Sequence, residues 1–305
     1  MSTSLATLSG QPLIKEYAQG AAQSATSQVA EFLAPTVNTS KHVGKYTAYD
    51  TESRFKIPDT LRGLGGKATQ LVFDRSSATF ECKPNALDTP LDNIEIEESE
   101  GMDLLKEAAD DAAFLGGLAH EKLVIDTAVS SAGSATGGTW SSDSNDPVAE
   151  LNTAIAEVVL AAGGSDMIQI GMIWSANAVR AFFANAKTKG YFPGMDAIAP
   201  TAENITKLLM GNVQHKISWL AADTAPKGKS TTLAFLMTSK VLVFARNPNP
   251  TRRDPSFMKT FRPRNRWMVP GIYPREDKRG EVVSMDWSAD VKATNTAAGK
   301  MFTIN

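Results

Sequence analysis

Hydrophobic residues are spaced as in a helix over one long stretch in the first half of the chain, from about Met102 to Ser130. Apolar positions there recur at steps of four and three, which puts on one helix face Leu104, Ala108, Ala112, Leu115, Ala119 and Leu123. At 1.5 Å per residue such a helix would be about 43 Å long, which suits a structural strut. Gly116-Gly117 lies within it and predicts a kink or a close backbone contact.

The chain before this helix is polar and then strand-like. Residues 1–28 are rich in small and polar side chains, and we expect a flexible or partner-ordered arm. Pro35 interrupts the apolar segment 29–37, which favours an extended docking strand over a helix. Runs rich in β-formers at 45–49 and from 71 to 80 predict a long two-stranded excursion with a tip broken by proline and glycine. An acidic run at 92–101 then leads into the helix, where negative charge is favourable.

The second half reads as alternating helices and strands. A Gly/Ser-rich linker at 130–146 predicts a subdomain boundary. Helices are predicted to begin at Pro147 and after Ser175, with a short one at 205–210. Strands are expected at 167–174, 213–219, 231–237, 240–245, 281–287 and 300–304. The pattern from 147 to 245 therefore predicts a small α/β subdomain.

Composition places the chain among ordinary globular proteins. It has 305 residues, a hydrophobic fraction of 42% and a formal net charge of −2, so we expect no global attraction to nucleic acid or to a membrane. No stretch reaches the ~20 apolar residues that a membrane helix needs, and the sequence after Met1 does not read as a secretion signal. Cys82 is the single cysteine, which excludes an internal disulfide framework and fits synthesis in a reducing cytoplasm.

Short motifs precede the long helix in a set order: FLAPTV at 32–37, GKY at 44–46, DTLR at 59–62, FEC at 80–82 with AL at 86–87, and DN at 92–93. This order of motifs, and the texture of the chain from about Val29 to Asn305, resembles the major capsid proteins of tailed bacteriophages. Those proteins share their fold with the herpesvirus capsid floor and with encapsulin shells. The resemblance implies an α+β fold.

The resemblance also implies a division of the chain. It comprises an N-terminal arm (1–43), an extended loop (44–85) that reaches over a neighbouring subunit, a peripheral domain with a spine helix (86–146), an axial domain (147–245), and a return to the peripheral domain (246–305). The last strand either stays with the peripheral domain or rejoins the axial one.

The function that follows from the resemblance is structural and not enzymatic. The chain would assemble with itself into pentamers and hexamers that close an icosahedral shell around double-stranded DNA. It would be made in the cytoplasm of a bacterial host and end in the virion capsid. The expected partners are a separate scaffolding protein, a portal, decoration proteins and weakly held DNA, with no membrane. The alternatives are an encapsulin-like shell around cargo enzymes and, from another class, a soluble α/β enzyme.

Motifs with catalytic or cofactor chemistry are weak. Residues 63–68 fit a loose dinucleotide pattern without the strand and helix that it requires, and 227–230 lack the first glycine of a phosphate loop. The histidines, His42, His120 and His215, have no metal-ligand spacing, and Cys82 reads as a small core residue. We therefore predict no catalytic, cofactor or metal site.

The strongest local charge feature is a basic group in the C-terminal part of the chain. Its members are Arg246, Arg252, Arg253, Lys259, Arg262, Arg264 and Arg266. Arginine suits bidentate pairing with carboxylates, so the first interpretation is contact with acidic residues such as Glu95 to Glu100 on neighbouring subunits. The other interpretation is weak, sequence-independent contact with DNA phosphates.

Overall fold

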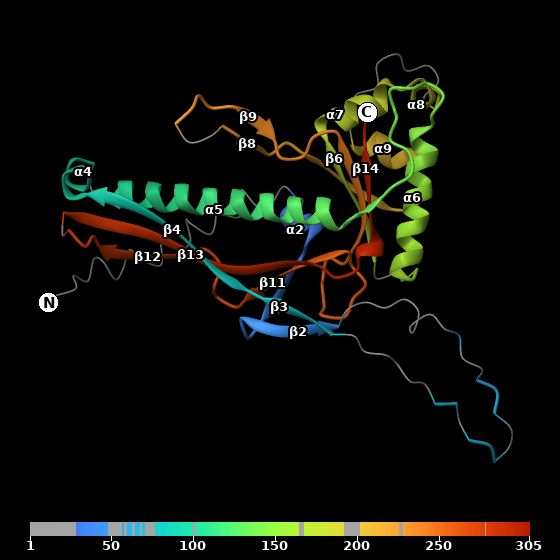
Figure 1. Ribbon diagram of the computed structural model, residues 1–305, viewed down its shortest axis with the longest axis horizontal. Coiled ribbons are helices and arrows are strands. Elements are labelled where there is room, and N and C mark those ends of the chain that lie inside the picture. The colour runs from blue at the N-terminus through green and yellow to red at the C-terminus, as the bar shows by residue number, and fades with distance from the viewer. Residues whose placement is uncertain are drawn as a thin grey trace.

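A computed structural model describes residues 29–47, 57, 60–62, 65–67, 69–70, 77–99, 102–164, 168–191, 202–225, 228–277 and 279–305. Figure 1 shows an elongated half, in which one long helix lies along a sheet, joined at one end to a compact half of helices and strands. The segment 1–28, expected as an arm, and most of the predicted excursion tip lie outside the described residues.

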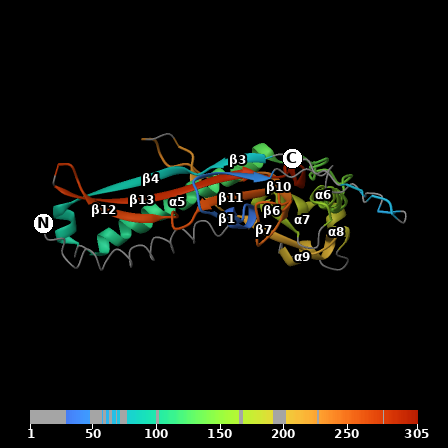
Figure 2. The same ribbon diagram turned by 90° about the horizontal axis from the view of Figure 1, so that it is seen from below.

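The elongated half is built on one sheet and one helix. Its central strand β13 (Gly280–Ala293) pairs antiparallel with β4 (Lys83–Asp92), β12 (Val269–Pro274) and β11 (Met258–Pro263). The strand β1 (Thr36–Thr39) extends this sheet by pairing in parallel with β11. Helix α5 (Met102–Ser131), of 30 residues, packs along β13, as Figure 2 shows. The predicted strut helix is therefore confirmed.

The face that α5 buries differs from the predicted one. Its first half packs small side chains, among them Ala109 and Ala113, against Met268, Met285 and Trp287. The predicted face is wrong beyond Ala112, because Leu115 and Leu123 are 55% and 49% exposed. In this first half the buried stripe consists of alanine and glycine, which allow the sheet to approach closely. Farther along the helix the stripe continues through His120, Glu121, Val124 and Ile125. Periodicity of large side chains could not reveal it.

The glycine pair does not break the helix. A methyl group placed on Gly116 would lie only 2.9 Å from Cε of Met268 and 3.4 Å from the Trp287 ring. Helix α5 is continuous through this point. Of the two predicted explanations, the close contact is confirmed.

The acidic run before α5 forms a helix of its own. Helix α4 (Asn93–Glu98) begins behind Asp92, whose side chain accepts a hydrogen bond from the Ile94 amide. Glu95 completes a capping box by accepting from the Asp92 amide at 3.2 Å. The acidic residues at 93–98 are thus part of a separate short helix at the far end of the elongated half.

The first described segment is helical before it is extended. Helix α2 (Ala30–Leu33) precedes Pro35, and β1 follows it. The prediction of an extended strand over 29–37 is therefore wrong for its first part and confirmed after Pro35. The short helix survives because tertiary contacts stabilise it: Val29 and Leu33 are buried in the core of the compact half.

The base of the predicted excursion is a two-stranded ladder. Strand β2 (Val43–Thr47) pairs antiparallel with β3 (Ser77–Glu81). The Phe80 ring stacks on Phe261 with centroids 4.5 Å apart, and Tyr46 stacks on the same ring at 5.2 Å. These aromatic contacts fix the ladder to β11 and so to the elongated half.

The compact half is an α/β layer structure. Its sheet has the order β5 (Gly133–Ser134), β14 (Gly299–Thr303), β10 (Lys240–Arg246), β6 (Gln169–Ser175) and β7 (Val213–Ser218). The helices around it are α6 (Pro147–Ala162), α7 (Ala176–Ala184), α8 (Ala186–Gly190) and α9 (Ala202–Leu208). The 3-10 helix η1 (Thr296–Ala298) directly precedes β14. The helices predicted behind Asp146 and Ser175 are confirmed, and both residues cap them.

The segment predicted as a linker, 130–146, is largely packed structure. It contains the end of α5, the strand β5 and Trp140, which is 1% exposed among Trp174, Phe182 and Phe302. The Trp140 indole donates to Glu150 at 2.8 Å, and the Asn185 amide donates to the Trp140 carbonyl at 3.0 Å. Gly137 and Gly138 have positive φ, and a methyl group on them would lie 2.3 Å from the Glu150 side chain and the Thr303 carbonyl oxygen, respectively.

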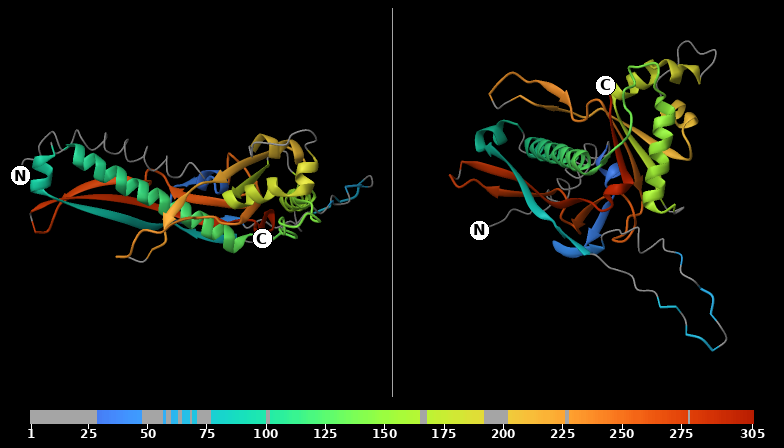
Figure 3. Two further views of the ribbon diagram at one scale, coloured as in Figure 1. Left: turned by 90° about the horizontal axis from the view of Figure 1, so that it is seen from above. Right: turned by 45° about the vertical axis from the view of Figure 1, so that its right-hand side comes forward.

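A separate hairpin projects from the compact half. Strand β8 (Ala221–Asp223) pairs antiparallel with β9 (Leu233–Phe235). Figure 3 shows it extending away from the compact half on the side of α5. The predicted strand at 231–237 is therefore confirmed only over its middle residues.

Candidate assembly surfaces

Lys259 belongs to the interior. It lies on β11 with 1% exposure, and its ammonium contacts the Asp254 carboxylate at 3.3 Å and the Asp254 carbonyl at 2.8 Å. Burial lowers the pKa of Lys259, while the carboxylate of Asp254 opposes that shift. Its placement in a basic surface group is wrong, because a buried ammonium paired with Asp254 reaches neither DNA nor another subunit.

Arg262 is also engaged inside the chain. Its guanidinium lies 3.6 Å from the centroid of the Trp267 ring and 3.4 Å from the Glu31 carboxylate. The edge of the His120 ring packs on Trp267 at 5.1 Å. Burial, and then the Arg262 charge, lower the pKa of His120 to about 3, so this imidazole is neutral at physiological pH. Arg262 therefore ties β11 to α2 and α5.

Arg246, at the end of β10, is partly buried. Its guanidinium lies 4.3 Å from the Phe32 ring centroid and donates to the Gln214 side chain at 2.9 Å. These contacts link the end of β10 with α2 and β7. Arg246 is partly accessible, but its known partners are internal.

The exposed members of the group lie before and after β11 in the chain. Arg252 and Arg253 precede that strand, and Arg264 and Arg266 follow it. The Arg252 guanidinium lies 5.8 Å from the centroid of the Phe80 ring, which stacks on Phe261 of β11. The role of these four arginines at an intersubunit or DNA-facing surface stays a prediction.

A buried carboxylate that the sequence did not single out holds the start of the described chain. Glu121 on α5 is 0% exposed and accepts hydrogen bonds from the backbone amides of Val29 at 3.1 Å and Ala30 at 2.9 Å. Burial raises the pKa of Glu121 to about 7, although the amides and Lys216 act in the other direction. It caps α2 in place of a local side chain. No sequence signal indicated this role, because Glu121 lies on the side of the helix opposite to the predicted apolar face.

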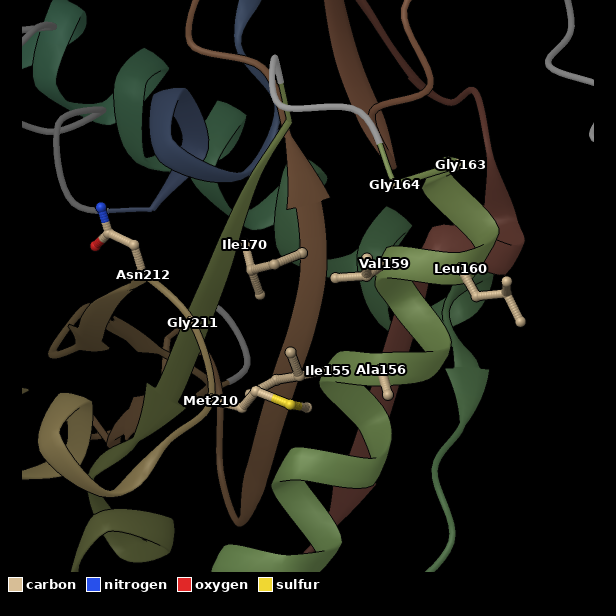
Figure 4. Close-up of a pocket in the computed structure, with 10 residues that line it drawn as sticks. All are labelled: Ile155, Ala156, Val159, Leu160, Gly163, Gly164, Ile170, Met210, Gly211 and Asn212. Carbon is tan, nitrogen blue, oxygen red and sulfur yellow. The ribbon is translucent and has the colours of Figure 1, made fainter. Parts of the chain in front are cut away.

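An apolar groove lies between α6 and the turn from α9 to β7. It has a volume of about 650 Å³. In Figure 4, Ile155, Val159, Ile170 and Met210 point toward one another across it, whereas Leu160 points away on the other side of α6. The Met210 amide donates to Asn152 at 2.8 Å and so fixes the turn to α6. No charged side chain lines the groove over the residues that the structure describes.

The remaining candidates for chemistry contact different parts of the fold. The Cys82 thiol is buried and donates to the Phe261 carbonyl at 3.3 Å; burial, followed by the charge of Asp290, raises its pKa to about 11. The prediction of a core cysteine is confirmed.

His215 accepts a hydrogen bond from the Trp174 indole at 3.1 Å, and burial lowers the pKa of His215 to about 4. The loose nucleotide-type motifs at 63–68 and 227–230 fall partly outside the described residues.

The described part of the chain holds no group of three or more His, Cys, Asp or Glu side chains that could bind a metal ion. Its helices include none that is long and apolar enough to cross a bilayer.

Sequence comparison gives one informative relative. No family model matches the chain. The major capsid protein of Pseudomonas phage JBD67 is 28% identical over 141 residues, which covers 43% of this chain and 46% of that protein. The match thus spans about half the length of the curated relative.

Solved structures match over nearly the whole chain. A phage-related protein from Bordetella bronchiseptica RB50 superposes with a TM-score of 0.69 at 17% identity, covering 95% of this chain and 96% of the other. The capsid of Myoviridae phage XM1 gives a TM-score of 0.55 at 11% identity, covering 91% of this chain and 92% of that one. The encapsulin complex of Synechococcus elongatus PCC 7942 gives 0.52 at 8%, covering 90% of this chain and 85% of that one.

These similarities define the fold. The chain has the α+β fold that phage capsid proteins and encapsulins share. Because the curated relative is itself a phage major capsid protein, the resemblance to major capsid proteins of tailed bacteriophages is confirmed.

Proposed function

We propose that this chain is the structural subunit of an icosahedral phage capsid, assembling into pentamers and hexamers around double-stranded DNA. The observation that carries the proposal is the elongated half: a 30-residue helix laid along a long antiparallel sheet, next to a compact α/β half. Such a shape offers contact surface along its whole length, which suits a shell better than a catalytic cleft. The similarity to a phage major capsid protein supports it.

We assign the parts of the chain as the resemblance implies. Residues 1–43 are the arm, 44–85 the extended loop, 86–146 the peripheral domain with α5 as spine, 147–245 the axial domain, and 246–305 the return to the peripheral domain. Separate apolar cores support the division: one fills the compact half, and another lies between α5 and the sheet of the elongated half. The last strand, β14, joins the sheet of the compact half, which favours its rejoining the axial domain.

The proposed partners follow from the role. Besides further copies of itself, the subunit works with a separate scaffolding protein, a portal and decoration proteins, without an enzymatic activity or a cofactor of its own. It is synthesised in the cytoplasm of a bacterial host and ends in the virion. Regular closed shells formed by the purified subunit alone would contradict the need for scaffolding.

We assign to the exposed arginines, which precede and follow β11 in the chain, contact with carboxylates of neighbouring subunits or with packaged DNA. The two roles are separable. Changing Arg252, Arg253, Arg264 and Arg266 to Gln together lowers particle yield if they pair with subunits. If they contact DNA, empty particles still form, but they retain DNA less well as salt rises. Unchanged assembly and unchanged salt dependence would exclude both roles.

The second candidate is an encapsulin-like shell, because the fold is shared with an encapsulin. The discriminating experiment is the content of particles made in the presence of the chain's phage-encoded neighbours. Double-stranded DNA inside supports the capsid, and a co-purifying enzyme inside supports the encapsulin. A small discrete oligomer that never forms particles would support an α/β enzyme instead.

The extended loop provides the sharpest test of the assigned parts. Residues 48–76 can be replaced by an Asn-Gly turn, which leaves the ladder from Thr47 and Ser77 inward and its stacking on Phe261 in place. We expect a folded subunit with an unchanged melting temperature that no longer forms shells. Normal shells from this variant would show that the loop has been assigned wrongly.

A further inference from the structure

We propose that the β8–β9 hairpin of one subunit docks into the apolar groove beside α6 of the next subunit in a ring. This inference rests on the proposed self-assembly. It names the surfaces that would meet within a capsomer.

The hairpin presents large apolar side chains to solvent. Trp219, Leu233 and Phe235 are 58%, 72% and 42% exposed. The Trp219 and Phe235 rings contact each other edge to face, with centroids 6.5 Å apart. A cluster of this kind on a projecting element is unfavourable in water and marks an interaction surface.

The hairpin is also held in a defined shape. The Asp223 carboxylate accepts hydrogen bonds from the amides of Ala225 at 2.9 Å and Thr232 at 2.8 Å. These bonds lower the pKa of Asp223, and the Thr224 amide donates to the Thr232 carbonyl at 2.9 Å. A preorganised projection loses little conformational entropy when it docks.

The groove is apolar, like the exposed side chains of the hairpin. Ile155, Val159, Ile170 and Met210 line it, and its described lining carries no charge that would be left unpaired when an apolar side chain enters. Val159 and Met210 remain 38% and 50% exposed, so the groove is open to a partner.

The position of the two surfaces selects a second copy as the occupant. In Figures 1 and 3 the hairpin extends from one side of the compact half, whereas α6 covers the opposite side. A projection and a groove on opposite sides of one chain make a head-to-tail contact, and such contacts close into rings when the rotation between subunits allows it.

The contact area fits a ring and not a free dimer. The exposed parts of the hairpin's aromatic and aliphatic side chains amount to on the order of 300 Å². A stable pair of proteins buries about 800 Å² on each partner. The hairpin contact is therefore one of several that act together within a capsomer and does not hold two subunits together alone.

Crosslinking of assembled particles tests the proposal with a matched control. Val159 lines the groove, whereas Thr153, an exposed residue on the same helix, does not. The native Cys82 is 2% exposed and will not compete for a short bismaleimide reagent. The test variant carries Val159→Cys with Leu233→Cys, and the control carries Thr153→Cys with Leu233→Cys.

The expected result is a ladder of crosslinked species up to whole rings from the test variant and none from the control. Mixed particles of the two single variants, V159C and L233C, should give dimers in addition to uncrosslinked chains. Particles that form without crosslinks in the test variant, or that crosslink equally in the control, overturn the proposal. Val159→Cys protected from reagent but not joined to Leu233→Cys indicates a different occupant and also overturns it.

A second test, for use when the cysteine variants do not assemble, introduces opposite charges on the hairpin and in the groove. Leu233→Lys and Met210→Glu should each lower the yield of particles about tenfold, a loss equivalent to ~1.4 kcal/mol, and their combination should restore it. Equal losses in the single and combined variants overturn the docking proposal while unmodified particles still form. Failure of the unmodified chain to form any particle would instead contradict the proposed function.

Discussion

The Glu121 carboxylate accepts a hydrogen bond at 3.1 Å from the backbone amide of Val29, which lies 92 residues earlier in the chain. With the second bond, from Ala30, it fastens α2 to α5. The first four amides of a helix lack partners within the helix, and a buried helix end needs them. Here the Glu121 side chain, distant in sequence, is the hydrogen-bond acceptor for the amides of Val29 and Ala30.

Removal of this anchor should destabilise the subunit. Glu121→Ala leaves the amides of Val29 and Ala30 buried without acceptors and opens a cavity. We expect the free energy of unfolding to fall by about 2–4 kcal/mol. Urea unfolding of unassembled subunits measures it. Glu107→Ala, at an exposed position of the same helix, is the control and should change stability by less than about 0.5 kcal/mol.

Glu121 should also make stability depend on pH. Its pKa is about 7 in the folded chain, against 4.5 for the free side chain. Between these values the folded state binds more protons than the unfolded state, so the free energy of unfolding falls as pH rises from 4.5 to 7. The decrease should be on the order of 3 kcal/mol.

The variant Glu121→Gln isolates this contribution. His120, with a pKa of about 3 when folded, contributes the opposite slope below pH 6.5 in both proteins and cancels in the comparison. The stability of the native chain relative to Glu121→Gln should therefore decrease across the interval. A pH-independent difference would contradict the raised pKa of Glu121.

The internal role of Lys259 gives a third prediction. Lys259→Met leaves Asp254, whose side chain is 7% exposed, without its charge partner, although the carboxylate keeps its hydrogen bonds from Thr251 and Ser256. We expect a loss of about 3–5 kcal/mol in the free energy of unfolding. Arg264→Gln, at an exposed position near the other end of the same strand, should be close to neutral. Equal, small effects of both substitutions would show that Lys259 is not buried as described.

Parts of this arrangement were predictable from the sequence because their signals are local. Asp146 and Ser175 predict helix starts because their side chains can cap a first turn, and the spacing of apolar residues over 102–130 predicts a helix. The internal partners of Lys259 and Arg262 were not predictable. Charge counts along a sequence do not reveal that Trp267 and Glu31 enclose the Arg262 guanidinium. Nor could the groove be predicted, since its walls come from α6, β6 and a turn brought together only by folding.

Close packing of β4 on β13 supplies a fourth prediction. A methyl group on Gly280 would lie 1.9 Å from the backbone carbonyl oxygen of Leu91, and backbone atoms cannot easily move aside. Gly280→Ala should therefore lower the free energy of unfolding by about 3 kcal/mol. Gly190→Ala, where the added methyl meets nothing within 4 Å, should stay within about 1 kcal/mol of the unmodified chain. Thermal melting of the two variants side by side provides the comparison.

A capsid subunit must build a shell. Negative-stain electron microscopy with size-exclusion chromatography, on the chain expressed with and without its phage-encoded neighbours, shows whether this chain does so. We predict closed icosahedral particles or capsomer rings when the neighbours are present. A monodisperse small oligomer under both conditions would contradict the capsid function and favour a soluble α/β enzyme instead.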